Sequence, residues 1–230
     1  MLQCRPAANK DPAEYVLELA SKFLISYFIG SFMGSLVMGR IRGGVDIRTM
    51  GSGNAGGTNA LRTQGLAFAL GVMVIDIGKG VIASAFVPGI DIPFIGSSPD
   101  ISREWLTLCC AAAAVIGHVW PMWHQFRGGK GAATLVGTLI VVAPYLLLPV
   151  ISIWVVVLLL SGFVGLSTIS AGISAPVLMW FLRFPEEQPV FIYCLAMCMY
   201  IIFSHRSNIR RMYRGEESRV TRAMLLRRNR

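Results

Sequence analysis

The segment best suited to chemistry is a glycine-rich stretch from Gly51 to Arg62, with four glycines in twelve residues. Glycine loses much backbone entropy in a helix or strand, so the stretch is expected to turn sharply and aim backbone N–H groups at one point. Such a nest binds anions. Hydroxyl, amide and guanidinium groups add donors suited to phosphate. The candidate binding residues are Gly51, Ser52, Gly53, Asn54, Gly56, Thr58, Asn59 and Arg62.

A second polar island lies between two long apolar runs. Its central lysine supplies a point charge, and the helix expected to start there supplies backbone N–H groups without intrahelical partners. It is therefore a candidate phosphate site. It is not a Walker A loop, because the eight-residue frame from glycine to lysine is absent. The candidate residues of this second island are Gly128, Gly129, Lys130, Gly131 and Thr134.

A third island, from Ser204 to Glu217, is dominated by arginine. One glycine-rich stretch alone could be a polar turn between hydrophobic segments, but three islands of similar chemistry favour phosphate binding. The candidate residues of this third island are His205, Asn208, Arg211 and Glu217.

The remaining histidines and the cysteines predict no metal site. His118 either faces the second island or caps the apolar segment before it, and His124 is expected to be an interface or capping residue. The five cysteines lack zinc-like spacing and form no disulfide framework; Cys194 and Cys198, one helical turn apart, are expected to pack in the core. We therefore predict neither a metal nor a cofactor.

Composition predicts an integral membrane protein. Of 230 residues, 54% are hydrophobic and only 14% are charged, and long apolar runs alternate with short polar islands. The net charge of +9 in such a chain reports membrane topology and does not predict nucleic-acid binding.

The apolar runs predict an all-α bundle of about seven transmembrane helices. The connections that bear the three islands are basic, whereas those at 89–104 and 185–188 are acidic. The positive-inside rule therefore places the islands in the cytoplasm, with the N-terminus outside and the C-terminus inside. The expected spans are Phe23–Gly39, Gly65–Pro88, Trp105–Trp123, Ala132–Pro149, Val150–Ser170, Ala171–Leu182 (short for a full span) and Pro189–Phe203.

This pattern divides the chain into an N-terminal segment (1–22), a transmembrane domain (23–204) and a cytoplasmic third island with a basic tail (205–230). Within the first span, Gly30 and Gly34 form a small-xxx-small pair that favours close helix packing. Asp76 and Lys79 lie three residues apart in the second span, so they share a helix face and are expected to form an ion pair inside the bundle. A direct catalytic role for this pair is the alternative.

The three islands, in this order and spacing, resemble the motifs of the acyl-phosphate-dependent, PlsY-type glycerol-3-phosphate acyltransferases of bacterial membranes. The resemblance covers nearly the whole chain outside the first twenty residues and the arginine-rich end after Val220. It departs slightly at Ala55 and Gly57, where proline and alanine would be expected. The matching residues are 51–62 in the first island, then Asp76, Lys79, Gly80, Gly117, His118, Pro121, 128–131, Ala133, Thr134, His205, Asn208, Arg211, Gly215 and Glu217.

The resemblance implies acyl transfer from acyl phosphate to the first hydroxyl of glycerol 3-phosphate at the cytoplasmic face of the bacterial inner membrane. It implies that Ser52 and Arg62 hold one phosphate with the loop N–H groups, that Lys130 helps hold the other, and that His205 and Asn208 orient the polar headgroups. It also implies that the donor's own phosphate takes the proton, with no protein general base. The implied partners are the two substrates and membrane lipids, without nucleic acid; the oligomeric state is left open.

Two other classes fit parts of the pattern. A membrane transporter of phosphorylated small molecules could use similar glycine loops, but transport sites tend to lie near mid-bilayer within inverted repeats, and no repeat is evident here. A soluble-type acyltransferase that uses acyl-CoA would need an Asp five residues after a catalytic histidine. None of His118, His124 and His205 has one.

Overall fold

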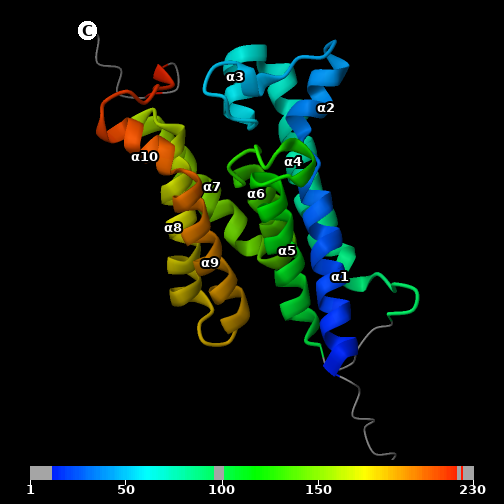
Figure 1. The fold of residues 1–230 in the computed structure, drawn as a ribbon. Helices are drawn as coiled ribbons and strands as arrows, with labels where there is room; N and C mark the ends of the chain where they lie inside the picture. The colour runs from blue at the N-terminus through cyan, green and yellow to red at the C-terminus, as the bar shows by residue number, and fades with distance from the viewer. Residues whose placement is uncertain (1–11, 96–100, 222–223, 225–230) are drawn as a thin grey trace, which may run out of the picture.

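The structure is a computed structural model, and it describes residues 12–95, 101–221 and 224. Its regular elements are helices packed side by side into an elongated bundle (Figure 1). The α-helices are α1 (Pro12–Ser31), α2 (Gly34–Ile41), α3 (Gly57–Gln64), α4 (Leu66–Ala85), α5 (Arg103–Val119), α6 (Ala132–Val142), α7 (Pro144–Ser161), α8 (Val164–Leu182), α9 (Gln188–Ser204) and α10 (Arg206–Tyr213). Short 3-10 turns occur at Ile47–Thr49, Val87–Gly89 and Met122–His124.

The predicted multi-span, all-helical class is confirmed. Within the described residues, four helical segments are long and apolar enough to cross a membrane, and up to six if two bent helix pairs are each counted as one span. The bent pairs are α1 with α2, at 40°, and α9 with α10, at 53°. α6 has 11 residues and is shorter than a full span.

Three predicted segments in the second half of the chain are divided at the wrong residues. The expected break at Pro149 is absent, because Pro149 lies inside α7. Pro144 instead starts α7, in the first helical turn, where the missing N–H of proline costs no hydrogen bond. The chain then turns at Gly162, whose φ of 73° allows the left-handed cap that ends a helix. The predicted segments Ala132–Pro149, Val150–Ser170 and Ala171–Leu182 are therefore replaced by α6, α7 and α8.

The predicted first span is also interrupted. Phe32 and Met33 separate α1 from α2. α1 begins at Pro12, so part of the predicted N-terminal segment belongs to this first helix. The expected close packing is confirmed: a Cβ added at Gly30 would lie 2.1 Å from the Ala114 carbonyl oxygen of α5, and one at Gly34 would lie 2.8 Å from a carbonyl oxygen of α4.

The main apolar core lies among α5 to α9. Leu139, Ala143 and Leu146 pack there with Ala175 and Cys194. Cys194 and its neighbour Cys198 are buried and unbridged, as expected of packing residues.

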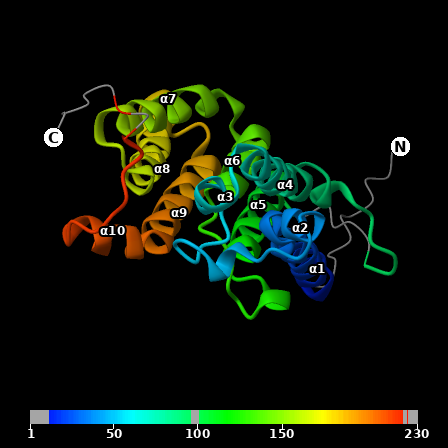
Figure 2. The same cartoon turned by 90° about the horizontal axis from the view of Figure 1, so that it is seen from above.

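The polar islands gather at one end of this bundle (Figure 1). α2, α3, the loop before α6, and α10 lie at this end, whereas the connections after α4 and between α8 and α9 lie toward the other. Seen from above, α3 lies between α9 and α4, over the end of the bundle (Figure 2). The bundle therefore brings residues from the beginning, middle and end of the sequence to one place.

Candidate functional site

The first island is a loop held by one buried amide. The Asn59 Nδ2 donates to the backbone carbonyls of Ile47, at 2.8 Å, and Met50, at 3.0 Å. Its Oδ1 accepts from the Ser52 N–H at 3.0 Å. Gly51 has a φ of 56°, and a Cβ there would lie 2.4 Å from the Asn59 Oδ1. Asn59 therefore shapes the loop from inside, while the Ser52 side chain lies exposed.

The loop leads into α3 and reaches the third island. Gly56 is the N-cap of α3, and no side-chain hydrogen bond caps this helix. Arg62, exposed in the last turn of α3, donates through Nη2 to the Ser218 carbonyl at 3.3 Å. Arg62 therefore connects the first island to the segment after α10.

The second island folds back over the end of α5. The N–H groups of Gly128 and Gly129 donate to the carbonyls of Val119, at 3.2 Å, and His118, at 3.1 Å. Gly131, with φ of 88°, is the N-cap of α6. His118, in the last turn of α5, is buried beneath this turn, and its ring faces the second island at Gly129, which is the first of the two alternatives that the sequence left open.

Lys130 joins the second island to the third. Its Nζ donates to the Asn208 Oδ1, and its backbone carbonyl accepts from the Ser204 hydroxyl at 2.9 Å. Burial, with a smaller contribution from the nearby Arg211 guanidinium, lowers the Lys130 pKa from 10.5 to about 8, and the Glu217 carboxylate opposes this shift. Lys130 is thus a cation whose charge is sensitive to mildly alkaline pH.

The third island continues this chain of polar contacts. The Asn208 Nδ2 donates to the Glu217 Oε1 at 2.7 Å. The Arg211 Nε donates to the other carboxylate oxygen of Glu217 at 2.6 Å. The Asn208 amide lies between two opposite charges. Its oxygen therefore faces the Lys130 ammonium, and its nitrogen faces the Glu217 carboxylate.

His205 is the C-cap of α9, where α10 bends away. Its Nδ1 lies 2.9 Å from the Ile201 carbonyl oxygen. A carbonyl oxygen only accepts, so Nδ1 carries the proton, and in the neutral ring Nε2 is the acceptor nitrogen. The Ser204 hydroxyl lies 3.2 Å from the same Nδ1.

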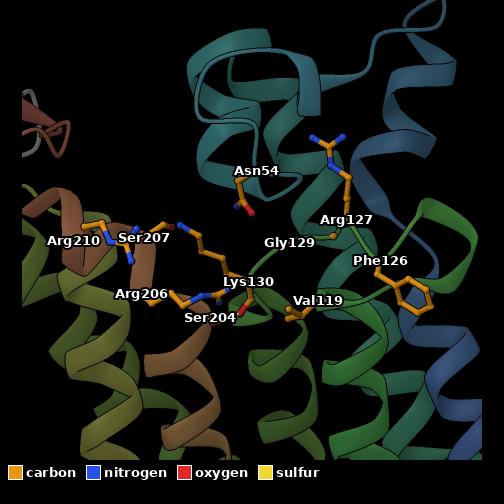
Figure 3. Close-up of a pocket in the computed structure, with 11 residues that line it drawn as sticks. Asn54, Val119, Phe126, Arg127, Gly129, Lys130, Ser204, Arg206, Ser207 and Arg210 are labelled. Carbon is orange, nitrogen blue, oxygen red and sulfur yellow. Dashed lines mark hydrogen bonds between the residues drawn. The ribbon is translucent and has the colours of Figure 1, made fainter.

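The three islands enclose a cavity of about 310 Å³ (Figure 3). Asn54 of the first island, the Lys130 side chain, and Ser207 and Arg210 of α10 lie around it in Figure 3, with Arg127 on the opposite side. Four cationic side chains therefore line one small space. The lining residues are Asn54, Val119, Phe126, Arg127, Gly128, Gly129, Lys130, Ser204, Arg206, Ser207 and Arg210.

The cavity holds only part of the predicted site. Asn54, Gly128, Gly129 and Lys130 line it, whereas the other predicted residues are not among its lining residues. Thr134 is fully buried in α6, and its hydroxyl has no hydrogen-bond partner in the described structure.

Sequence reasoning missed several lining residues. Arg127, Arg206 and Arg210 were part of the basic islands, but the matched motifs do not include them. The surplus of arginine in the second and third islands was the signal that could have identified them.

Comparison with known proteins identifies related chains. A family model for glycerol-3-phosphate acyltransferase matches residues 20–215. The glycerol-3-phosphate acyltransferase of Chlorobaculum tepidum is 35% identical over 227 residues, which cover 90% of this chain and 98% of the relative. The enzyme of the same name from Chlorobium luteolum is 37% identical over 230 residues, with the same coverage of both chains.

The fold has experimental counterparts as well. A crystal structure of PlsY, an integral membrane glycerol 3-phosphate acyltransferase, in its glycerol 3-phosphate form matches with a TM-score of 0.73 and 29% identity over 87% of this chain and 94% of that chain. The lysophosphatidic acid form of PlsY matches with a TM-score of 0.72 and the same identity. The sequence comparisons and the structural comparisons thus indicate the same family over most of this chain.

Proposed function

This chain belongs to the glycerol-3-phosphate acyltransferase family, and we propose that it transfers a fatty acyl group from acyl phosphate to the sn-1 hydroxyl of glycerol 3-phosphate. The products are lysophosphatidic acid and inorganic phosphate, in the first step of phospholipid synthesis. The observation that carries the proposal is a cationic cavity to which residues of all three islands contribute. Each substrate brings a phosphate group that such a cavity suits.

The proposed reaction requires little acid–base catalysis by the protein. The hydroxyl oxygen attacks the acyl carbonyl carbon, a new ester C–O bond forms, and the C–O bond to the phosphate breaks. The departing phosphate carries away the electron pair and takes the hydroxyl proton. Because an acyl phosphate is a mixed anhydride with a good leaving group, holding both substrates in line and stabilising phosphate charge supply most of the rate.

Each island has a part in this scheme. Lys130 holds one phosphate from within the cavity, and the first island, with Ser52 and Arg62, holds the other. Asn208 orients Lys130, and His205 orients the headgroups. The other predicted binding residues shape the loops that present these groups.

We also propose a seven-pass topology, with the N-terminus outside and the cavity facing the cytoplasm from the bacterial inner membrane. In this topology α1 with α2 forms the first pass, α6 is a partial one, and the segment from residue 205 is cytoplasmic. The gathering of basic loops at one end of the bundle and acidic ones toward the other supports the proposal.

The test is turnover by the purified protein in lipid nanodiscs, with palmitoyl phosphate and glycerol 3-phosphate. We expect phosphate and lysophosphatidic acid in equal amounts, dependent on both substrates. Lys130→Met serves as the impaired control, and palmitoyl-CoA replaces the acyl phosphate in a parallel reaction. Turnover with palmitoyl-CoA alone would refute the proposed donor. Uptake of glycerol 3-phosphate into proteoliposomes without turnover would establish the transporter alternative.

A further inference from the structure

A buried ion pair crosses the break between α1 and α2. Lys79 Nζ lies 2.9 Å from the Asp76 Oδ1, and both side chains are at most 4% exposed, so the predicted pair is confirmed. Lys79 also donates to the Phe32 carbonyl at 2.8 Å, and Asp76 accepts from the Gly34 N–H at 3.2 Å. The pair therefore satisfies a backbone carbonyl and a backbone N–H at a helix interruption inside an apolar bundle.

The same lysine reaches a third helix. The Lys79 Nζ lies 2.7 Å from the Nδ1 of His118 in α5. An ammonium group has three protons and no acceptor, so Nδ1 accepts. The three protons of Lys79 are thus matched by three acceptors, on the α1/α2 break, on α4 and on α5. No donor is left for a substrate, and neither charged residue of the pair lines the cavity.

The His118 ring supports the turn that carries Lys130. A Cβ added at Gly129 would lie 2.1 Å from the His118 Nε2, so the turn lies directly on the ring. The Gly129 N–H also donates to the His118 carbonyl at 3.1 Å. The position of the ring therefore sets the position of the turn, one residue before the cavity lysine.

We propose that Asp76, Lys79 and His118 are positioning residues that hold the Gly128–Gly129 turn and thereby aim Lys130 at a substrate phosphate. The inference rests on the proposed function and adds residues that act through Lys130 without touching substrate. A misplacement of about 1 Å can reduce an enzyme's rate about 100-fold, so loss of the network should reduce turnover strongly.

Lys79→Met is the main variant, and Lys22→Met is its matched control. Lys22 is equally buried, pairs with Glu18 at 2.7 Å and donates to the Pro88 carbonyl at 2.8 Å, near the connection after α4 and away from the cavity. Both substitutions break a buried ion pair and a contact to a backbone carbonyl. The assay measures kcat/KM for palmitoyl phosphate between pH 6.5 and 10, per folded molecule counted by size-exclusion chromatography.

We expect Lys79→Met to lose about 100-fold in kcat/KM. We also expect the alkaline decline in the pH–rate profile of Lys79→Met, its alkaline limb, to move to higher pH. A loosened turn leaves Lys130 better hydrated, which raises its pKa. The charged and titratable groups around Lys130 are unchanged in both variants; they are Arg62, Arg211, Glu217 and His205, with Arg127, Arg206 and Arg210 of the cavity lining. Lys22→Met should keep kcat/KM within about 3-fold of wild type and keep the limb in place. Equal losses in both variants, or an unmoved limb in Lys79→Met, would overturn the inference.

A charge swap supplies a test that does not rely on Lys79→Met alone. Asp76→Lys combined with Lys79→Asp keeps a pair of opposite charges but places a carboxylate beside the Phe32 carbonyl and removes the acceptor from the Gly34 N–H. We expect no recovery, whereas Asp76→Asn, which keeps an acceptor, should lose less than the swap. Recovery of kcat/KM in the double variant would contradict the positioning role, because it would show that the pair only neutralises charge. Absence of turnover in the wild type would instead refute the proposed function.

Discussion

Lys130 and Asn208, which are 78 positions apart in the sequence, meet through a hydrogen bond from the Lys130 Nζ to the Asn208 Oδ1. This contact joins the loop before α6 to α10. Because Asn208 also donates to Glu217, the lysine is oriented by the third island and not only by its own loop. Both islands must therefore be in place for the cavity to present its charge.

Charge at position 130 should decide activity. We expect Lys130→Met to lower kcat/KM by about 30- to 1000-fold, since a charge-assisted contact to a phosphate is worth ~2–4 kcal/mol in the transition state. Lys130→Arg keeps the charge and should lose less. Steady-state phosphate release measures both. Equal losses in the two variants would show that shape at this position matters more than charge.

The rate should also fall at mildly alkaline pH. In the proposed function the charged form of Lys130 binds phosphate, and the Lys130 pKa is lowered to about 8, so kcat/KM should be full well below pH 8 and decline as pH rises through this value. Substrate phosphates, whose second pKa is about 6, are already dianions there and add no alkaline limb. In Lys130→Arg the limb should move above pH 10, because guanidinium stays protonated. A limb unchanged by that substitution would belong to another group.

Replacing Asn208 alone should lower activity, and a second substitution at Glu217 should restore part of it. Asn208→Asp removes the donor to Glu217 and places two carboxylates side by side, so we expect a loss of at least 10-fold in kcat/KM. Glu217→Gln in the same chain restores a donor–acceptor pair and should recover part of the loss. A double-mutant cycle on kcat/KM measures this coupling. Additive losses would mean that the two side chains act independently.

His205 should orient and not act as a base. Its Nδ1 proton is engaged by the Ile201 carbonyl, so His205→Gln, which keeps a donor, should retain more activity than His205→Ala. The pH–rate profile of the Gln variant should keep the wild-type shape. Burial, with a smaller contribution from the nearby Lys130 ammonium, lowers the His205 pKa from 6.5 to about 4. If His205→Gln were as inactive as His205→Ala, and a wild-type limb near pH 4 disappeared with it, the histidine would be the general base.

Single cysteines in a chain freed of its five native ones can test topology. We expect Ser52→Cys and Ser207→Cys, both at exposed positions, to react with a membrane-impermeant maleimide only from the cytoplasmic side. Phe94→Cys, at a fully exposed position in the connection after α4, should react only from outside. Labelling of positions 52 and 94 from the same side would contradict the proposed arrangement.

Much of the architecture is readable in the sequence because membrane spans and basic loops leave strong local patterns. The three islands, the ion pair of Asp76 with Lys79 and the close approach at Gly30 depend on residue type and short spacing. The helix ends around Pro149 and Gly162 were mispredicted because both residues lie in an unbroken apolar run. In such a run the sequence does not show that the helix continues through Pro149 and ends at Gly162.

The site was harder to predict in detail. Asn59 and His118 are polar residues within or beside the islands, but both are buried, and only the fold shows that their polar groups bind other parts of the protein. Arg206 and Arg210 line the cavity because α10 bends 53° away from α9, an angle that no local pattern indicates. A motif therefore indicates which residues belong to the site, but the contacts between residues far apart in sequence are visible only in the fold.

The bond between Arg62 and the Ser218 carbonyl spans 156 positions of sequence, and it has a consequence for biosynthesis. A nascent chain emerges from its N-terminus, so the glycine loop and the lysine turn are synthesised well before α10. Until residues 204–217 have been translated, the cavity lacks the side that Ser204 and α10 supply, and Lys130 lacks its contact with the Asn208 amide. We therefore expect a ribosome-bound intermediate to be inactive and acyl transfer to begin only when the last helices have joined the bundle.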